Sequence, residues 1–512
     1  MRNAPQVRTT AGIYEGSWQD DIAVFRGIRF AATTEKERRW RLPEPPKSFG
    51  GVRPAQDYGP ACPQPEGVDS IYKAAARLAG SENLLNIEIG PQDEDCLSLN
   101  VWTPGLDDSN RPVMVWIHGG AGVYGSATDS LFRGDHLAER QNVVVVSIHY
   151  RLGVLSYLAH PEIGPDVNFA IHDQVAALRW IQANIARFGG DPENVTIFGE
   201  SAGGRAVLEL MATPMAAGLF HRGIAQSPWD ADHHQRHPTE KIGRHEPASA
   251  LAEKLAEKLG VDVAGLRSIE ANDLIQAALS LGDPSTVWGT LLDGQVLPAH
   301  PLAVIARGQH NKVPLMVGFN ANEGEVFFLE GLPFNDAEGY QRWVGKRLGP
   351  FADDVLALYP PHDDAYELRR SFVRLIGDRA FTWTALAAAY GATNYGPVFT
   401  YYFTRVEKPF TDEALRPHGL TLGAFHGAEI GYAFGRTKRG RMRLKNHPLG
   451  RAMMDYWSRF AETGDPNGGV DAVPWPSFAD DGAYLELGDE IRPAHTLRAE
   501  SLELWRRIMT AR

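Results

Sequence analysis

Short, uninterrupted runs of apolar residues recur along the chain and are separated by polar or glycine-rich stretches. The clearest are Val113–Ile117, Val143–Ile148, Val195–Phe198 and Pro314–Gly318, and Thr400–Phe403 is a further candidate. Runs of this length without alternation are typical of strands that are buried on both faces of a mostly parallel sheet.

Between two of these runs, apolar residues are spaced like one face of a helix. Ile171, Val175, Leu178 and Ile185 follow this spacing, and the pattern ends at the Phe-Gly-Gly-Asp-Pro segment, residues 188–192. Strand, helix and strand in alternation predict an α/β fold with a doubly wound, mostly parallel sheet.

Two long segments, roughly residues 230–310 and 330–395, are helix-like but lie outside this rhythm. We expect them to be helical insertions that cap the sheet and build a substrate pocket. The chain has no internal repeat, low-complexity tract or recognisable linker. We therefore expect residues 1–512 to form a single domain, a size that a mixed α/β enzyme can hold around one core.

The charge balance argues against two classes of partner. The 512 residues carry a formal net charge of −12, so phosphate backbones and anionic lipid headgroups would be repelled. The apolar runs are far shorter than the roughly 20 residues of a membrane span. We expect a soluble monomer or small homo-oligomer that binds neither nucleic acid nor membranes.

The N-terminus has no apolar segment typical of an export signal, which favours the cytoplasm unless such a signal has been removed. The two cysteines, Cys62 and Cys96, are either one disulfide or two buried thiols. A bridge would close a loop of about 35 residues, stabilise the fold by roughly 3–4 kcal/mol and favour an oxidising compartment. Three nearby histidines, His233, His234 and His237, are typical of a solvated surface, and we expect neither a metal nor a cofactor.

A candidate nucleophile follows the run Val195–Phe198. Residues 199–204 read Gly-Glu-Ser-Ala-Gly-Gly and lead into a helical pattern, which is the strand, sharp turn and helix that a G-x-S-x-G motif requires. Glycines two before and two after Ser201 let the turn tighten without Cβ clashes. The helix N-terminus directs free N–H groups and the positive end of its dipole at a developing oxyanion.

A glycine-rich segment follows the run Val113–Ile117 and reads His-Gly-Gly-Ala-Gly-Val-Tyr over residues 118–124. A turn of this kind can direct backbone N–H groups at a carbonyl oxygen, as in the oxyanion loops of esterases and lipases. The alternative is a phosphate-binding loop, but no Lys-Ser/Thr pair follows and the G-x-G-x-x-G spacing is absent.

In these motifs and in further segments nearly from end to end, the chain resembles the type B carboxylesterase family, which also contains the cholinesterases. The matching segments are 25–28, 39–40, 43–45, 94–104, 150–153, 199–204, 293–294, 425–429 and 464–467. The resemblance implies the α/β-hydrolase fold and a triad of Ser201 as nucleophile, His426 as base and Glu323 as the orienting acid. It also implies oxyanion donors at Gly120, Ala121 and Ala202.

These roles suit a serine esterase that forms an acyl-enzyme, because a serine hydroxyl needs a neutral imidazole to accept its proton. Activity should therefore rise with pH through a pKa of about 6–7. The family pattern selects Glu323, rather than Glu325, as the acid. It also implies supporting roles for Glu200 and Ser227, and internal salt bridges that join Arg39 to Glu94 and Arg151 to Asp173.

The chain departs from the family pattern where the acyl group would bind. Gly122 replaces an aromatic residue, Pro228 and Trp229 replace a glycine, and Arg205 stands where a small residue is usual. The simple interpretation pairs Arg205 with Glu209 at i+4 on a helix surface. The sharper hypothesis is that Arg205, with help from Arg236, binds a carboxylate on the acyl group.

Two alternatives to an esterase remain at this stage. An amidase or carbamate hydrolase would use the same triad on a C–N bond, and the motifs do not separate it from an esterase. A non-catalytic binding module with a cholinesterase-like fold would not need the nucleophile, the acid and the base, all of which are present.

Overall fold

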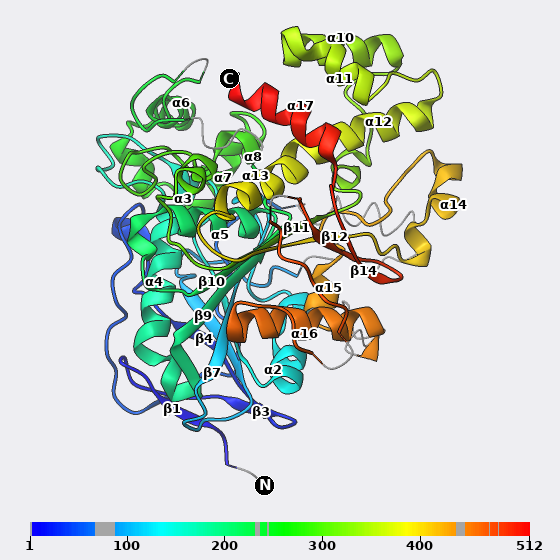
Figure 1. Cartoon of the computed structure of the whole chain (residues 1–512). Coiled ribbons are helices and arrows are strands. Elements are labelled where there is room, and N and C mark those ends of the chain that lie inside the picture. Colours follow the sequence, from blue (N-terminus) through cyan, green and yellow to red (C-terminus); the bar gives the residue numbers. More distant parts are fainter. Residues whose placement is uncertain are drawn as a thin grey trace.

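A computed structural model describes residues 3–66, 88–230, 236–242, 245–436, 446–469, 472–479 and 481–511. Its centre is an 11-stranded sheet in the order β14-β13-β12-β11-β10-β9-β7-β8-β6-β4-β3, beside a small sheet in the order β1-β2-β5 (Figure 1). Seven strands run parallel to one another, in the order β8, β7, β9, β10, β11, β12 and β13. Antiparallel strands are added at both ends of this parallel part, β14 at one end and β6, β4 and β3 at the other. The expected α/β fold with a mostly parallel sheet is confirmed.

The strands are β1 Gln6–Arg8, β2 Ile13–Glu15, β3 Ser17–Gln19, β4 Ile22–Arg29, β5 Val52–Pro54, β6 Ser98–Thr103, β7 Arg111–Ile117, β8 Val144–Ile148, β9 Gly190–Glu200, β10 Arg222–Gln226, β11 Leu315–Asn320, β12 Val398–Phe403, β13 Tyr484–Leu487 and β14 Ile491–Ala494. The helices are α2 Asp135–Gln141, α3 Val154–Tyr157, α4 Phe169–Asn184, α5 Ala202–Ala212, α6 Ser249–Leu259, α7 Ala271–Leu279, α8 Pro284–Val287, α9 Pro301–Ala306, α10 Ala337–Leu348, α11 Ala352–Leu358, α12 Ala365–Gly377, α13 Trp383–Ala392, α14 Asp412–Leu415, α15 Ile430–Ala433, α16 Pro448–Thr463 and α17 Ala499–Thr510.

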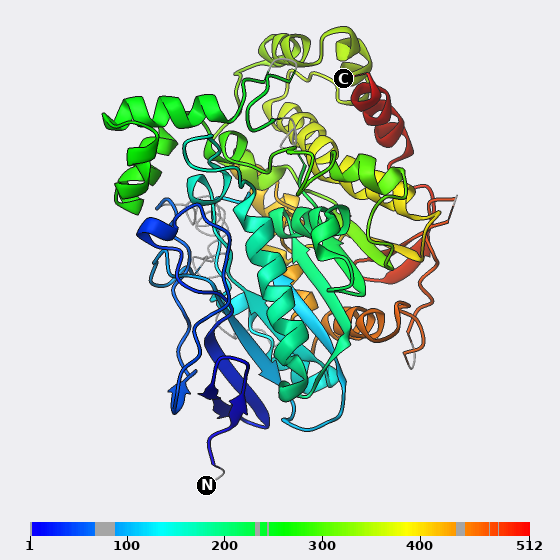
Figure 2. The same cartoon turned by 90° about the vertical axis from the view of Figure 1, so that its left-hand side faces the viewer.

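The central strands bury both faces, as their uninterrupted apolar runs predict. Val113, Val115 and Ile117 of β7 belong to one core cluster, which includes residues of α4 and α5. Met114 and Trp116, which point to the opposite face, belong to a second cluster with residues of α2 and α16. The helices that cover the two faces are seen from the side in Figure 2.

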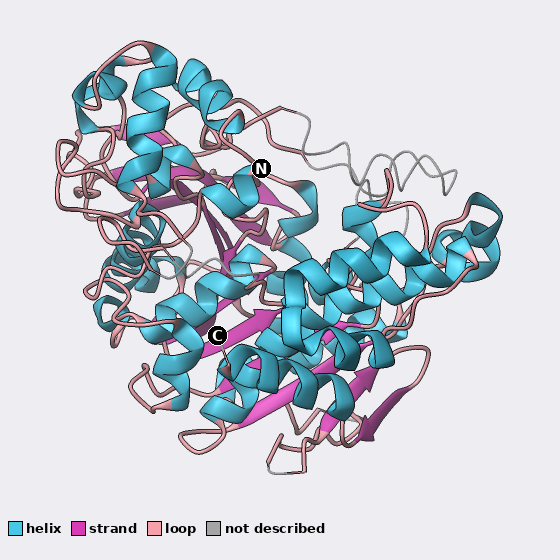
Figure 3. Cartoon of the chain, turned by 90° about the horizontal axis from the view of Figure 1, so that it is seen from above, coloured by secondary structure: helices cyan, strands magenta, loops and turns pink. Residues whose placement is uncertain are grey.

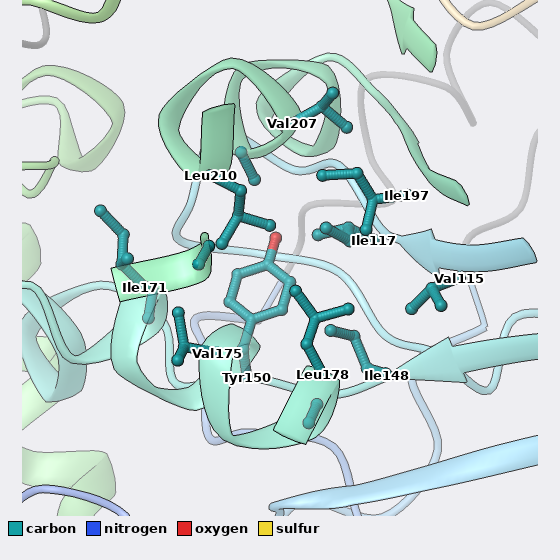
Figure 4. Close-up of a cluster of buried hydrophobic side chains, with 14 of the residues drawn as sticks. Val115, Ile117, Ile148, Tyr150, Ile171, Val175, Leu178, Ile197, Val207 and Leu210 are labelled. Carbon is teal, nitrogen blue, oxygen red and sulfur yellow. The ribbon is translucent and has the colours of Figure 1, made fainter. Parts of the chain in front are cut away.

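The core on the first face of the sheet includes the buried side chain of Tyr150. Side chains of the strands, of α4 and of α5 surround the ring of Tyr150 (Figure 4). The Tyr150 hydroxyl donates a hydrogen bond to the His118 carbonyl oxygen at 2.7 Å, and the His118 ring stacks on Tyr150 with 4.4 Å between centroids. The turn that follows β7 is thereby fixed to the core.

Helices of the segments 249–306 and 337–392 lie above the ends of the strands (Figure 3). The group α10, α11, α12 and α17 has a small core of its own, in which Tyr340, Phe372 and Trp505 are fully buried. Helix α13, by contrast, packs against β11 and contributes Ala385 and Leu386 to the main core.

Both internal salt bridges implied by the family resemblance are present. Arg151 and Asp173 are buried and form a bidentate pair, with Nη2 to Oδ1 at 2.7 Å and Nε to Oδ2 at 2.8 Å. Arg39 Nε donates to Glu94 Oε2 at 2.7 Å. Removing one partner of such a pair would leave an uncompensated buried charge.

Cys62 and Cys96 are free thiols, both buried, so the disulfide that the sequence left open is not formed in this structure. Burial and the neighbouring Cys62 thiol hold the pKa of Cys96 well above its ordinary value. None of the helices in the described part of the chain is long and apolar enough to cross a membrane.

Candidate active site

Ser201 lies in the sharp turn between β9 and α5, with φ 59° and ψ −121°. A non-glycine residue in this region of backbone space is strained and persists only where its surroundings hold it. Its N–H donates to the Gln226 carbonyl at 2.9 Å, and its carbonyl accepts from the N–H of Trp229 at 3.2 Å. The turn therefore holds the serine at the carboxyl end of the sheet, with 8% of the residue exposed.

The glycines that flank the serine are required by space. A Cβ on Gly199 would stand 2.5 Å from the Ile117 carbonyl oxygen, and one on Gly203 would stand 2.0 Å from the same atom. Real Cβ atoms do not approach backbone this closely, so any side chain would push α5 away from β7. The steric reason given for the G-x-S-x-G spacing is thus seen directly.

The glycine-rich turn after β7 packs against the turn between β9 and α5 that holds Ser201. A Cβ on Gly119 would lie 3.2 Å from Ser201 Cβ, and Gly120 and Ala121 have φ of +111° and +58°. The N–H groups of Gly120, Ala121 and Ala202 have no acceptor among the residues that the structure describes. Three donors without partners beside one hydroxyl are what an oxyanion hole requires.

Glu323 and His426, the acid and base expected from the sequence, are 103 residues apart in the chain and in contact in the structure. His426 Nδ1 lies 2.6 Å from Glu323 Oε2, and both side chains are buried. The other oxygen of Glu323 accepts from the Ser227 hydroxyl at 2.6 Å and from the Asn320 N–H at 2.6 Å. The carboxylate is fixed on both sides, which in turn orients the imidazole.

Glu200 occupies the other side of the imidazole. Its Oε1 lies 3.1 Å from His426 Nε2, and within the described residues no hydrogen bond joins His426 to Ser201. In substrate-free hydrolases such catalytic hydrogen bonds are often long or absent and tighten with substrate. In this structure, the Nε2 side of the His426 ring faces Glu200.

The electrostatics of this cluster differ from those of an isolated histidine. Burial lowers the pKa of His426, but the carboxylates of Glu200, Glu323 and Glu429 outweigh burial and raise it to about 9. Burial also raises the pKa of Glu200 to about 8. Glu200 and His426 are in contact, so they share protons as a coupled pair and do not titrate independently. The pKa of about 6–7 expected from the sequence ignores these charges.

Glu429, three residues after His426, is a functional neighbour that sequence reasoning did not single out. It is fully buried and accepts hydrogen bonds from Asn320 Nδ2 at 2.6 Å and Gln226 Nε2 at 3.1 Å. Burial raises its pKa. Glu429 is the last residue of the family-matching segment 425–429, so the sequence did contain a signal for it.

Aromatic side chains flank the imidazole and were also missed. The ring of Phe381 lies 4.3 Å from the His426 ring, and that of Phe327 lies 5.4 Å away with 43% of the residue exposed. Phe381 comes from a π-helical turn, Asp378–Thr382, between α12 and α13. Such turns are rare and frequent at functional sites, but nothing in the local sequence marks this one.

Arg205 is buried rather than at the helix surface. Its Nε lies 3.2 Å from Glu209 Oε1, and each side chain is 3% exposed. The expected i+4 pairing is present, but the surface-type contact is wrong because α5 is covered on all sides. Arg205 Nη2 is 2.8 Å from where a Cβ on Gly122 would stand, and its guanidinium lies 5.8 Å from the Trp229 ring.

Arg236, the second arginine of the carboxylate-binding hypothesis, is not found in contact with Arg205. Arg236 is half-buried, and among the described residues no contact joins it to Arg205. His233 and His234 lie outside the described residues. In the part of the chain that is described, no group of three or more His, Cys, Asp or Glu side chains is arranged to hold a metal ion.

One cavity in the described part of the chain is lined by none of Ser201, Glu323 and His426. It has a volume of about 450 Å³ and lies beside Asn322 and Glu325, which flank the acid Glu323 in sequence. Arg370, Arg374, Arg498, Tyr402 and His362 are among the residues that line it. Burial raises the pKa of Glu325 to about 7. Glu325 Oε1 accepts from Asn322 at 2.7 Å and does not contact His426, in agreement with Glu323 as the acid.

Comparison with known proteins gives one consistent result. The model of the "Carboxylesterase family" matches residues 3–505. The chain is 32% identical to a para-nitrobenzyl esterase of Bacillus subtilis, over 92% of each protein. It is also 32% identical to a fumonisin B1 esterase of Sphingopyxis macrogoltabida, over 94% of this chain and 86% of that relative. A solved structure of a PNB esterase superimposes with a TM-score of 0.82 at 30% identity, covering 98% of this chain and 99% of the other.

Proposed function

The chain belongs to the carboxylesterase family, and from that premise we propose that its ester hydrolysis proceeds through an acyl-enzyme on Ser201. His426 is the general base and acid, and Glu323 orients it. The backbone N–H groups of Gly120, Ala121 and Ala202 stabilise the oxyanion, at about 3–4 kcal/mol for a donor of this kind.

In the first half of the reaction, Ser201 Oγ attacks the ester carbonyl carbon while His426 Nε2 takes the hydroxyl proton. The tetrahedral oxyanion forms beside the glycine-rich turn. It collapses when the C–O bond to the alcohol breaks and His426 returns the proton to the leaving oxygen. The alcohol departs, and the acyl group stays on Ser201.

In the second half, water repeats the sequence. His426 takes a proton from water, the hydroxide attacks the acyl carbon, and Ser201 leaves with the proton that His426 gives back. Glu323 does not change its protonation state. Its role is to hold Nδ1–H, which keeps the proton-accepting nitrogen of the ring directed at the substrate side.

The observation that carries this proposal is the 2.6 Å contact of His426 Nδ1 with Glu323 Oε2, buried beside a serine in a strained elbow. Buried charges of this kind are costly, so their presence supports a functional assignment. Ser227 is proposed to be a positioning residue for Glu323, and Glu200 to hold the imidazole between turnovers.

The direct test is labelling with an organophosphate, followed by peptide mapping. We expect a single adduct on Ser201, loss of ester hydrolysis in step with labelling, and no labelling after Ser201→Ala. A label on another residue, or full labelling with activity retained, would overturn the assignment. Assaying an ester and an amide with the same acyl group shows how far the C–O bond is preferred over C–N.

We further propose that the whole chain acts as a single domain with its helical segments as a cap, that it is a monomer or small homo-oligomer, and that it works in the cytoplasm. The free, buried thiols of Cys62 and Cys96 support a reducing compartment. Fractionation and light scattering test the last two points.

A further inference from the structure

A buried guanidinium with unused donors lies next to the proposed nucleophile. Arg205 follows Ser201 by one turn of α5, and 3% of its side chain is exposed. Glu209 pairs with its Nε, and the same Glu209 oxygen accepts a hydrogen bond from the Thr290 hydroxyl at 2.7 Å. Arg205 Nη1 is buried and has no hydrogen-bond partner among the residues that the structure describes.

This is an unusual state for an arginine. A guanidinium carries five N–H donors, and buried donors in folded proteins nearly always have acceptors. Glu209 Oε1 lies 3.2 Å from Arg205 Nε, but neither Nε nor Nη1 has a hydrogen-bond partner among the described residues. The end of the guanidinium, formed by Nη1 and Nη2, is a fork of two nitrogens. That fork has the planar spacing that matches the two oxygens of a carboxylate.

The fork lies against the oxyanion turn. Arg205 Nη2 would be 2.8 Å, and the Tyr157 hydroxyl 3.2 Å, from a Cβ on Gly122, which follows the oxyanion residue Ala121. Arg205 and Tyr157 thus take up the space that a side chain at residue 122 would need, which brings Nη2 close to the backbone of the turn. Trp229, whose N–H binds the Ser201 carbonyl, has its ring 5.8 Å from the guanidinium carbon. Arg205 is therefore enclosed by residues that build the reaction centre.

The leaving alcohol must lie against His426, because that imidazole returns the proton to it. Arg205 has no contact with His426 or Glu200 among the described residues, and its neighbours are the oxyanion turn and Trp229. The acyl part of the ester, on the other side of the carbonyl carbon, is thus the part that reaches Arg205.

We propose that Arg205 binds a carboxylate carried by the acyl group, so that the preferred substrates are monoesters of dicarboxylic or polycarboxylic acids. The proposal rests on the esterase function above. It differs from the hypothesis based on sequence in using the end-on fork of Arg205 alone, without Arg236. The other acid that acts on Arg205, Asp230, has its Oδ2 2.8 Å from Nε2 of His300.

The first test uses the unaltered protein. Monomethyl esters of succinic, glutaric and adipic acid are compared by kcat/KM with methyl alkanoates of equal length, and free glutarate is compared with glutaramide as a competitive inhibitor. We expect the charged ester of the fitting length to be favoured about tenfold to a hundredfold over its neutral match, and only glutarate to inhibit. Equal kcat/KM for both series, with no inhibition by the dicarboxylates, would overturn the proposal.

The second test uses variants. Arg205→Met is combined with Glu209→Gln so that no lone carboxylate is buried, and Arg205→Lys keeps the charge without the fork. The charged-to-neutral selectivity ratio should fall about tenfold or more in the double variant and by less in the lysine variant. Arg111→Met, a buried arginine paired with Asp107 at the start of β7, is the matched control whose ratio should not change.

The failure of this inference differs from failure of the proposed function. If Arg205 has no part in recognition, the double variant changes kcat/KM for both series by one factor while organophosphate still labels Ser201. If the triad assignment is wrong, neutral esters are hydrolysed without a label on Ser201 in the unaltered protein. A double variant that does not label is unfolded, and the first test then decides alone.

Discussion

Replacing Glu200 by glutamine should move the pH profile of the enzyme to lower pH. Activity requires a neutral His426, so kcat/KM rises with pH through the pKa of the base. The carboxylates around His426 hold that pKa above its ordinary value of 6.5, at about 9, and Glu200 at 3.1 Å contributes the most to the rise. Removing its negative charge lowers the pKa of the imidazole and extends activity into more acidic buffers.

The size of the change follows from the same cluster. Glu200 is one of three carboxylates that together oppose burial and account for a rise from 6.5 to about 9. A share of one third or more of this rise corresponds to a fall of about 1 in the apparent pKa. The sign is fixed, because a neutral neighbour cannot favour the imidazolium as a carboxylate does.

The assay is kcat/KM for a slow methyl ester between pH 5 and pH 10, with the acid product quantified by chromatography so that indicator ionisation plays no part. Glu325→Gln is the matched control, since Glu325 is also a buried carboxyl of raised pKa but does not contact His426. An acid limb that stays in place, or moves to higher pH, in Glu200→Gln would refute the account of a shared proton. If Glu200→Gln lowers the rate but leaves the acid limb of the pH profile in place, the role of Glu200 is merely structural.

Three further outcomes are expected. Ser201→Ala should remain folded by circular dichroism and lose about 10⁶ in kcat, and retention of a tenth of the activity would exclude Ser201 as nucleophile. Glu323→Gln should lose about a thousandfold or more in kcat, whereas Glu325→Gln should lose less than about tenfold; the reverse order would exchange their roles. Arg151→Met should lower the free energy of unfolding in urea by about 3–5 kcal/mol, whereas Arg506→Met, in an exposed and solvent-screened pair, should change it far less, and equal effects would contradict the buried-pair argument.

The parts of the fold that sequence predicted are those with a strong local signal. Every apolar run that was identified is a strand of the central sheet, and α4 ends at Asn184, where a 3-10 turn leads into the glycine pair. Several of the strands that were missed are short or contain polar residues, as in β10 and β13, although β4 was missed too and begins with four buried apolar residues. Their identity depends on the neighbouring strand that completes their hydrogen bonds, which no window of local sequence contains.

The same division applies to the site. Ser201 and the oxyanion turn are local motifs, and their geometry follows from glycines whose missing Cβ atoms would clash with backbone. The surroundings of His426 are not local, because Glu200, Phe381 and Glu429 reach it from three parts of the chain. Its pKa and the burial of Arg205 therefore emerged only with the tertiary structure.

The three residues of the proposed triad lie far apart in the chain, so catalytic activity should appear late in synthesis and folding. Ser201 follows β9, Glu323 follows β11, and His426 lies beyond β12, so a ribosome-bound chain that ends before residue 426 has a nucleophile and no base. Contacts of such long sequence separation form slowly, after local helices and turns. During refolding, recovery of hydrolysis should lag behind the recovery of helical circular dichroism, and the protein becomes an enzyme only when nearly all of its sheet is assembled.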